Sequence, residues 1–80
     1  MNIGMAVKYR ILQYCKLRGI TINKLATISG IARSTVKNIT GGRNNSATIS
    51  TIKKLCDGLE ISLVDFFDAK VFDDLEQEIR

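Results

Sequence analysis

The sequence predicts an all-α fold: a compact bundle of five short helices followed by a C-terminal sixth helical segment. The chain has 80 residues, enough for one small domain, and no proline that would interrupt a helix. Apolar residues recur three or four positions apart along most of its length, as on the buried face of a helix. Glycines stand where one such stretch ends and the next begins, which is where helices commonly stop.

The first two helices are predicted over residues 5–18 and 22–29. Apolar residues at i, i+4, i+7 and i+8 form one face of the first helix: Val7, Ile11, Tyr14 and Cys15. Gly19 ends this helix, Thr21 caps the start of the second, and Gly30 ends the second. The apolar face of the second helix is formed by Leu25, Ala26 and Ile28.

The third helix is predicted over residues 32–40 and the fourth over residues 49–59. The Gly41-Gly42 pair ends the third helix, and Gly58 closes the fourth. Their inward faces are formed by Val36 and Ile39, and by Ile49, Ile52, Leu55, Cys56 and Leu59.

A fifth helix is predicted over residues 63–68, capped by Ser62 with Asp65 at its third position. Apolar residues then continue at helical spacing through an acidic segment, at Val71, Phe72, Leu75 and Ile79. We therefore expect a domain over residues 1–68 and an acidic amphipathic helix over residues 69–80, which is a candidate dimerisation segment.

The two parts of the chain differ sharply in charge. Residues 1–54 hold ten lysines and arginines and no acidic residue, whereas residues 55–80 hold all eight acids and only Lys70 and Arg80. The net charges of the two parts are therefore +10 and −6. A basic body without acids predicts a polyanionic partner. Scattered surface lysines do not explain a complete lack of acids over 54 residues.

The residue types that most enzymes need are missing. The chain contains no histidine, and its carboxylates are confined to the last 24 residues. Neither a nucleophile–base pair nor a set of metal ligands is therefore evident. Cys15 and Cys56 stand at core-like helical positions, and we expect them to be buried, reduced thiols. We expect no catalytic residue, no metal, no cofactor and no small-molecule ligand.

Membrane insertion and secretion are not expected. The longest apolar runs are only a few residues, far short of a membrane span. The first ten residues contain neither a long apolar region nor a small-residue cleavage pattern. The expected location is the cytoplasm.

Residues 19–67 resemble the Cro/phage-repressor family of bacterial regulators, often called the XRE family. The order and spacing of several features carry the resemblance: Leu25-Ala26, Gly30, Ser34-Thr35-Val36, Gly41-Gly42, the fourth helix and the stretch 61–67. The resemblance implies a lambda-repressor-like bundle whose second and third helices form a helix-turn-helix. In such a pair, Ala26 is small because the third helix crosses close to it, and Gly30 supplies a left-handed backbone.

The resemblance also implies which residues meet double-stranded DNA. Positions that touch base edges in the family correspond to Ala32, Arg33, Ser34, Lys37 and Asn38. Arginine can bond guanine O6 and N7 together, and asparagine can do the same with adenine N6 and N7. Positions that contact phosphate correspond to Thr21, Asn23, Thr35, Gly42, Arg43, Asn44 and Thr48.

The chain departs from the family pattern at two places. The second helix of the family often starts with a phosphate-binding glutamine, where this chain has Ile22; Thr21 or Asn23 could replace that contact. The family often pairs an arginine of the first helix with a glutamate after the recognition helix, where this chain has Cys15 and Thr40. Loss of both members of a buried pair can be nearly neutral, so the fold stays credible.

One such domain contacts about one half-site, so we expect a homodimer on a near-palindrome. The candidate interface residues are Phe66, Phe67, Val71, Phe72, Leu75 and Ile79. The expected function is a transcriptional regulator, a repressor, associated with the nucleoid of a bacterial or phage-infected cell. An alternative is an antitoxin-like regulator whose tail binds a cognate protein. A generic RNA binder is disfavoured because the exposed helix has no aromatic side chain for stacking.

Overall fold

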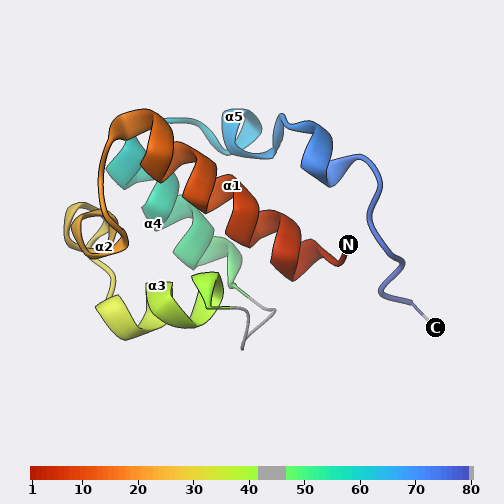
Figure 1. The fold of residues 1–80 in the computed structure, drawn as a ribbon, viewed down its shortest axis with the longest axis horizontal. Helices are drawn as coiled ribbons and strands as arrows, with labels where there is room; N and C mark the ends of the chain where they lie inside the picture. Colours follow the sequence, from red (N-terminus) through yellow and green to blue (C-terminus); the bar gives the residue numbers. More distant parts are fainter. Residues whose placement is uncertain (42–46, 80) are drawn as a thin grey trace.

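The computed structural model describes residues 1–41 and 47–79 and confirms the predicted all-α fold (Figure 1). Within these residues, five α-helices follow one another: α1 (Ile3–Arg18), α2 (Ile22–Ser29), α3 (Arg33–Thr40), α4 (Ile49–Leu59) and α5 (Leu63–Phe67). A short 3-10 helix, η1 (Lys70–Phe72), comes after them. The first helix starts two residues earlier than predicted, because Asn2 caps it by accepting a hydrogen bond from the Met5 amide at 2.8 Å.

The helices enclose one apolar core. α2 packs on both α3 and α4, α3 packs on α1, and α5 packs on α4. The largest fully buried side chains come from all five helices: Phe66, Ile11, Leu25, Leu55, Leu59, Val36 and Cys56. Ala26 is also fully buried. No helix in the described part of the chain is long and apolar enough to cross a membrane.

The end of α4 differs from the prediction. Gly58 does not close the helix; it lies inside it, and Glu60 ends the helix in a left-handed conformation with φ 57°. A left-handed conformation costs a residue with a Cβ roughly 1–2 kcal/mol. The Glu60 amide still bonds the Asp57 carbonyl, so the turn is kept despite this strain.

Replacing Glu60 with glycine is expected to raise the free energy of unfolding by about 1 kcal/mol, because glycine adopts this conformation without a steric penalty. Thermal or urea unfolding checks the gain. Glu60→Ala is the matched control, since it removes the same carboxylate but keeps the Cβ. An equal gain in both variants would show that charge, and not backbone strain, is responsible.

Gly58 is inside α4 because α2 lies against it. A Cβ placed on Gly58 would stand 3.0 Å from Ser29 Cα and 3.1 Å from Ser29 Cβ, closer than side chains normally approach. The Ser29 hydroxyl, in turn, is buried and has no hydrogen-bond partner among the described residues. The two helices therefore meet here through a glycine and a small side chain.

Gly58→Ala is expected to destabilise the protein by about 1–3 kcal/mol, because the added methyl group must push α2 and α4 apart. Urea unfolding measures the loss. The double variant Ser29→Gly/Gly58→Ala should recover part of it. Wild-type stability in the single variant would mean that the two helices are not in close contact.

Arg10 is a buried cation, although nothing in the sequence distinguishes it from the other cations of α1. It is only 8% exposed, and it holds the C-terminal end of α5. Its Nε donates to the Phe66 carbonyl at 2.7 Å, and its Nη2 donates to the Asp65 carbonyl at 2.6 Å. The guanidinium also lies 4.6 Å from the centre of the Tyr14 ring. Carbonyl dipoles at a helix C-terminus favour a cation, which explains how the charge is accommodated without a carboxylate.

The predicted amphipathic helix over residues 69–80 is wrong. Of residues 69–79, which the structure describes, only the three of η1 are helical, and residues 73–79 are irregular. Ala69 gives no side-chain cap, and a helix this short is marginal without tertiary support. The Phe72 ring instead packs against the Phe67 ring with 5.0 Å between the ring centroids. The Glu76 amide donates to the Met1 carbonyl at 3.1 Å.

The structure also changes the list of interface candidates. Phe66 is fully buried, so it is a core residue and cannot form a surface contact. Phe67 and Phe72 are half-buried and pack against the core, and Val71 and Leu75 are half-buried too. Ile79 is the one candidate with a largely free side chain, 87% exposed.

Candidate nucleic-acid interface

α2 and α3 are joined by a tight turn. Gly30 has φ 66° and ψ 32°, the left-handed conformation predicted for it. The Ile31 amide then bonds the Ala26 carbonyl at 3.0 Å, which closes the end of α2. The chain leaves this turn through Ala32, which precedes the first residue of α3 in an extended conformation. The two helices are thereby fixed at an angle to each other (Figure 1).

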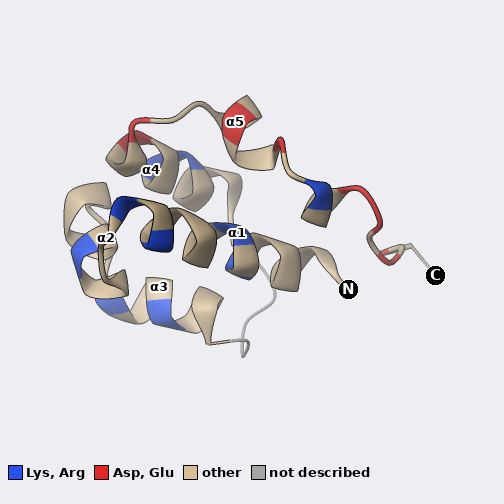
Figure 2. Ribbon diagram, turned by 45° about the horizontal axis from the view of Figure 1, so that its top comes forward, with Lys and Arg blue, Asp and Glu red and all other residues tan. Residues whose placement is uncertain are grey.

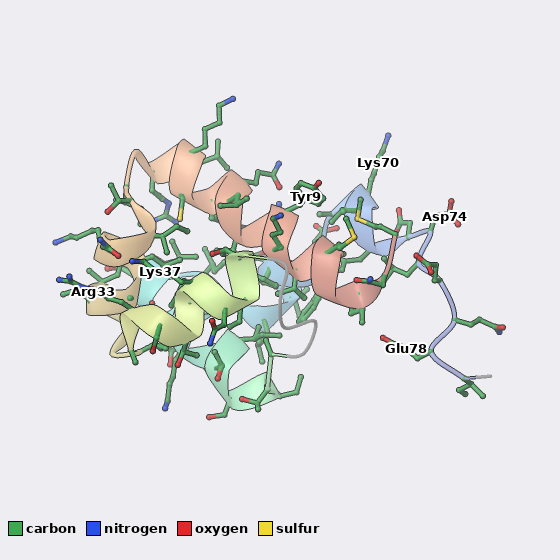
Figure 3. The ribbon with its side chains drawn as sticks, turned by 60° about the horizontal axis from the view of Figure 1, so that its bottom comes forward. Tyr9, Arg33, Lys37, Lys70, Asp74 and Glu78 are labelled. Carbon is green, nitrogen blue, oxygen red and sulfur yellow. The ribbon has the colours of Figure 1, made fainter. Side chains whose placement is uncertain are left out.

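α3 has one buried side and one open side. Val36 is fully buried and Ile39 is 5% exposed, so the inner side is locked into the core. All five residues predicted to read base edges are exposed: Ala32, Arg33, Ser34, Lys37 and Asn38. Arg33 and Lys37 project from the same helix in Figure 3. An exposed helix face with a guanidinium, an amide and a hydroxyl offers the donors that base edges in the major groove accept.

The open side of α3 is electropositive. All Lys and Arg residues of α1, α2 and α3 lie on helices without an acidic residue, while the acids lie at the end of α4, on α5 and in the tail, where Lys53, Lys54 and Lys70 are the further cations of the described chain (Figure 2). Within the described residues, the only side-chain ion pair joins Lys53 to Asp57 on α4, and this carboxylate raises the pKa of Lys53. Arg33 and Lys37 therefore have no carboxylate partner in the described chain, so their charge is available to an anion.

The predicted phosphate contacts divide into three groups. Thr21 and Asn23 are exposed at the start of α2, where the Thr21 hydroxyl accepts from the Lys24 amide at 3.0 Å. Thr35 is half-buried, and the Thr48 hydroxyl donates to Thr51 Oγ1 while it caps α4, so neither is fully free. Three of the predicted positions lie outside the described residues: Gly42, Arg43 and Asn44.

The residues at which the chain departs from the family pattern are uncharged, so none of them is a buried charge without a partner. Cys15 is buried, and burial raises the pKa of its thiol. Thr40 donates its hydroxyl to the Val36 carbonyl at 2.9 Å, within its own helix. Ile22 is half-buried against the core, so it contributes packing where the family often has a glutamine. An apolar and locally bonded set of side chains thus replaces the missing ion pair.

The second cysteine behaves in the same way. Cys56 is fully buried, and burial is again the main cause that raises its thiol pKa. Both thiols are free and lie in the core, as predicted. Both cysteines pack in the apolar core between the helices and do not belong to the open side of α3.

The sequence model of the Cro/C1-type HTH DNA-binding domain matches residues 10–71. This match covers most of the chain, including α2, the turn and α3. The chain belongs to this family of helix-turn-helix DNA-binding domains, which is a family of regulators and not a class of enzymes.

Two similar proteins agree with this assignment. The chain is 35% identical over 57 residues to the HTH-type transcriptional regulator SlrR of Bacillus subtilis (strain 168), with 71% of this chain covered. The match spans 38% of that relative's length. The crystal structure of the prophage Lp1 protein 11 superposes with a TM-score of 0.81 at 36% identity, and covers 94% of this chain and all of that one.

Proposed function

We propose that this protein is a sequence-specific transcriptional repressor that inserts α3 into the major groove of a near-palindromic operator. The observation that carries the proposal is the exposed side of α3, where Arg33 and Lys37 lie without a carboxylate partner in the described chain. An α-helix fits the major groove, and that groove presents a distinct pattern of donors and acceptors for each base pair.

The roles of the side chains follow from their chemistry. Arg33 bonds guanine O6 and N7, and Asn38 bonds adenine N6 and N7. Ala32 contacts a thymine methyl group, Ser34 accepts several bases, and Lys37 meets a base or a phosphate. Thr21 and Asn23 at the start of α2 contact the DNA backbone, where phosphate oxygens meet exposed amide and hydroxyl donors.

In this proposal the protein represses transcription by occupying the promoter DNA. A homodimer would place two α3 helices in successive major grooves about 34 Å apart, and thereby cover roughly one and a half turns of duplex. RNA polymerase cannot use a promoter that is covered in this way. The name of the SlrR relative, a transcriptional regulator, supports the regulatory role. In this proposal the protein acts in the cytoplasm on the nucleoid.

An antitoxin-like regulator is the second candidate. The acidic residues Asp73, Asp74, Glu76 and Glu78 are exposed, so the tail could bind a basic partner protein. Purification of the untagged protein from its host separates the candidates. Stoichiometric recovery of a second protein would favour the antitoxin-like reading, and recovery of this chain alone would favour the repressor.

Selection of binding sites from a random duplex pool tests the proposal. We expect a near-palindromic site in which Arg33→Ala and Asn38→Ala each lose about 1–3 kcal/mol at one base position and relax the preference there. Lys54→Ala on α4, an exposed cation away from α3, is the control and should keep the full preference. A pool without enrichment, or binding that depends on salt alone, would refute the sequence-specific function.

A further inference from the structure

The outer side of α1 carries a second apolar stripe that the described chain leaves partly exposed. Met5, Tyr9 and Leu12 are 36%, 44% and 37% exposed, on the side opposite the buried Val7 and Ile11. Their spacing of four and then three residues is the spacing with which one helix packs along another. In Figure 3, Tyr9 projects from α1 on the side away from α3. The stripe is therefore separate from the DNA-binding side.

Charge restricts what can cover this stripe. Lys16 continues the spacing at the next position, and Lys8 borders the stripe with its ammonium 5.6 Å from the centre of the Tyr9 ring. α1 contains no acidic residue. Two copies of the stripe would therefore repel each other, whereas an acidic amphipathic helix would match both its apolar side chains and its cations.

The tail of the same chain has this chemistry. Leu75 and Ile79 are four residues apart, and Asp74, Glu76 and Glu78 lie on the flanks of the helix that this spacing describes. The structure shows the tail without that helix and with Ile79 87% exposed. A segment with helical patterning and no helix is typical of a chain that folds on binding.

The tail does not reach the stripe of its own copy. The Glu76 amide is bonded to the Met1 carbonyl, at the N-terminal end of α1. From there the chain runs past the N-terminal end of α1, as Figures 1 and 2 both show, and Glu78 lines a pocket with Ile3, Gly4 and Val7, none of which belongs to the stripe. The stripe runs in the opposite direction, from Met5 toward Lys16. A second copy is the partner that this geometry allows.

We propose that the acidic tail of each copy binds as a helix along the outer stripe of α1 in a second copy, so that two tails are exchanged in a symmetric dimer. Leu75 and Ile79 contact Met5, Tyr9 and Leu12, and the tail carboxylates pair with Lys8 and Lys16. The inference deepens the proposed function, on which it rests, by assigning the surface that makes the regulator a dimer.

A charge-swap experiment tests the exchange. One variant carries Lys8→Glu and Lys16→Glu, and the other carries Asp74→Lys and Glu78→Lys. Each variant alone opposes like charges at both contacts, and we expect its dimer dissociation constant to rise by at least about tenfold in sedimentation equilibrium. An equimolar mixture restores opposite charges at both contacts, so a heterodimer should form. Dimerisation should also increase the helical circular dichroism signal, because the tails become helical.

Three outcomes would overturn the inference: a wild-type chain that stays monomeric at high concentration, variants that dimerise as the wild type does, or a mixture that does not associate. Lys24→Glu/Lys54→Glu makes the same charge change away from the stripe and should not alter self-association. Binding of the monomeric variants to a single half-site separates the two proposals. If a monomeric wild type still prefers one half-site, the dimer inference fails, whereas sequence-specific DNA binding by α3 stands.

Discussion

Replacing both Arg33 and Lys37 with glutamate is expected to weaken binding to the selected duplex by on the order of 100-fold or more. The two side chains lie one turn apart on the exposed side of α3, with no carboxylate partner among the described residues. Reversal of both charges removes base and phosphate contacts and adds repulsion from the DNA backbone. Fluorescence anisotropy at several salt concentrations measures the loss, and the slope of affinity against salt should fall.

The fold should survive this double change, since neither side chain contributes to the core. Lys54→Glu/Lys70→Glu reverses the same number of charges at exposed positions elsewhere. This control should bind DNA nearly as well as the wild type, apart from a small long-range effect of net charge. Equal losses in both double variants would show that total charge, and not the surface of α3, determines DNA binding.

Phe66→Ala is expected to lower the free energy of unfolding by about 3–5 kcal/mol. Phe66 is the largest fully buried side chain, and its ring meets Phe67 edge-on at a centroid distance of 5.0 Å. A domain of this size is stable by roughly 4–12 kcal/mol in total, so the loss would leave the protein marginally folded. The cavity would also loosen α5, which Arg10 holds through the Phe66 carbonyl.

Urea unfolding followed by circular dichroism checks this loss of stability. Val64→Ala, on the same short helix but 78% exposed, is the matched control and should stay within about 0.5 kcal/mol of the wild type. A similar small effect for Phe66→Ala would contradict the place of Phe66 in the core. DNA binding by any folded Phe66→Ala protein should be unchanged, because α5 packs on α4, whereas α3 packs on α1 and α2.

Helix caps, the turn at Gly30 and the exposed side of α3 could be predicted from the sequence, because neighbouring residues determine them. Thr21 and Ser62 cap their helices through bonds to the amides three residues on, as hydroxyl side chains at helix starts do. Gly30 takes the left-handed conformation that the turn requires. The exposed side of α3 could also be predicted from helical spacing. Because Val36 and Ile39 are buried on one side of the helix, Arg33 and Lys37 lie on the other side and are exposed.

Features that depend on contacts between distant residues could not be read in this way. Arg10 looks like an ordinary helix cation in the sequence, and only its contact with α5, 56 residues away, makes it a buried clamp. Gly58 resembled a helix stop, but its role is close packing against Ser29. The tail has helical spacing, but it packs on its own copy through η1 and through the bond from the Glu76 amide to the Met1 carbonyl without forming that helix, so spacing alone gave the wrong structure.

Methylation interference on the selected duplex tests the central claim most directly, because methyl groups at guanine N7 lie in the major groove and those at adenine N3 lie in the minor groove. We expect that methylation of one guanine N7 in each half-site blocks wild-type binding, and that Arg33→Ala loses this sensitivity. Interference at adenine N3 alone, or at no base, would show that α3 does not read the major groove.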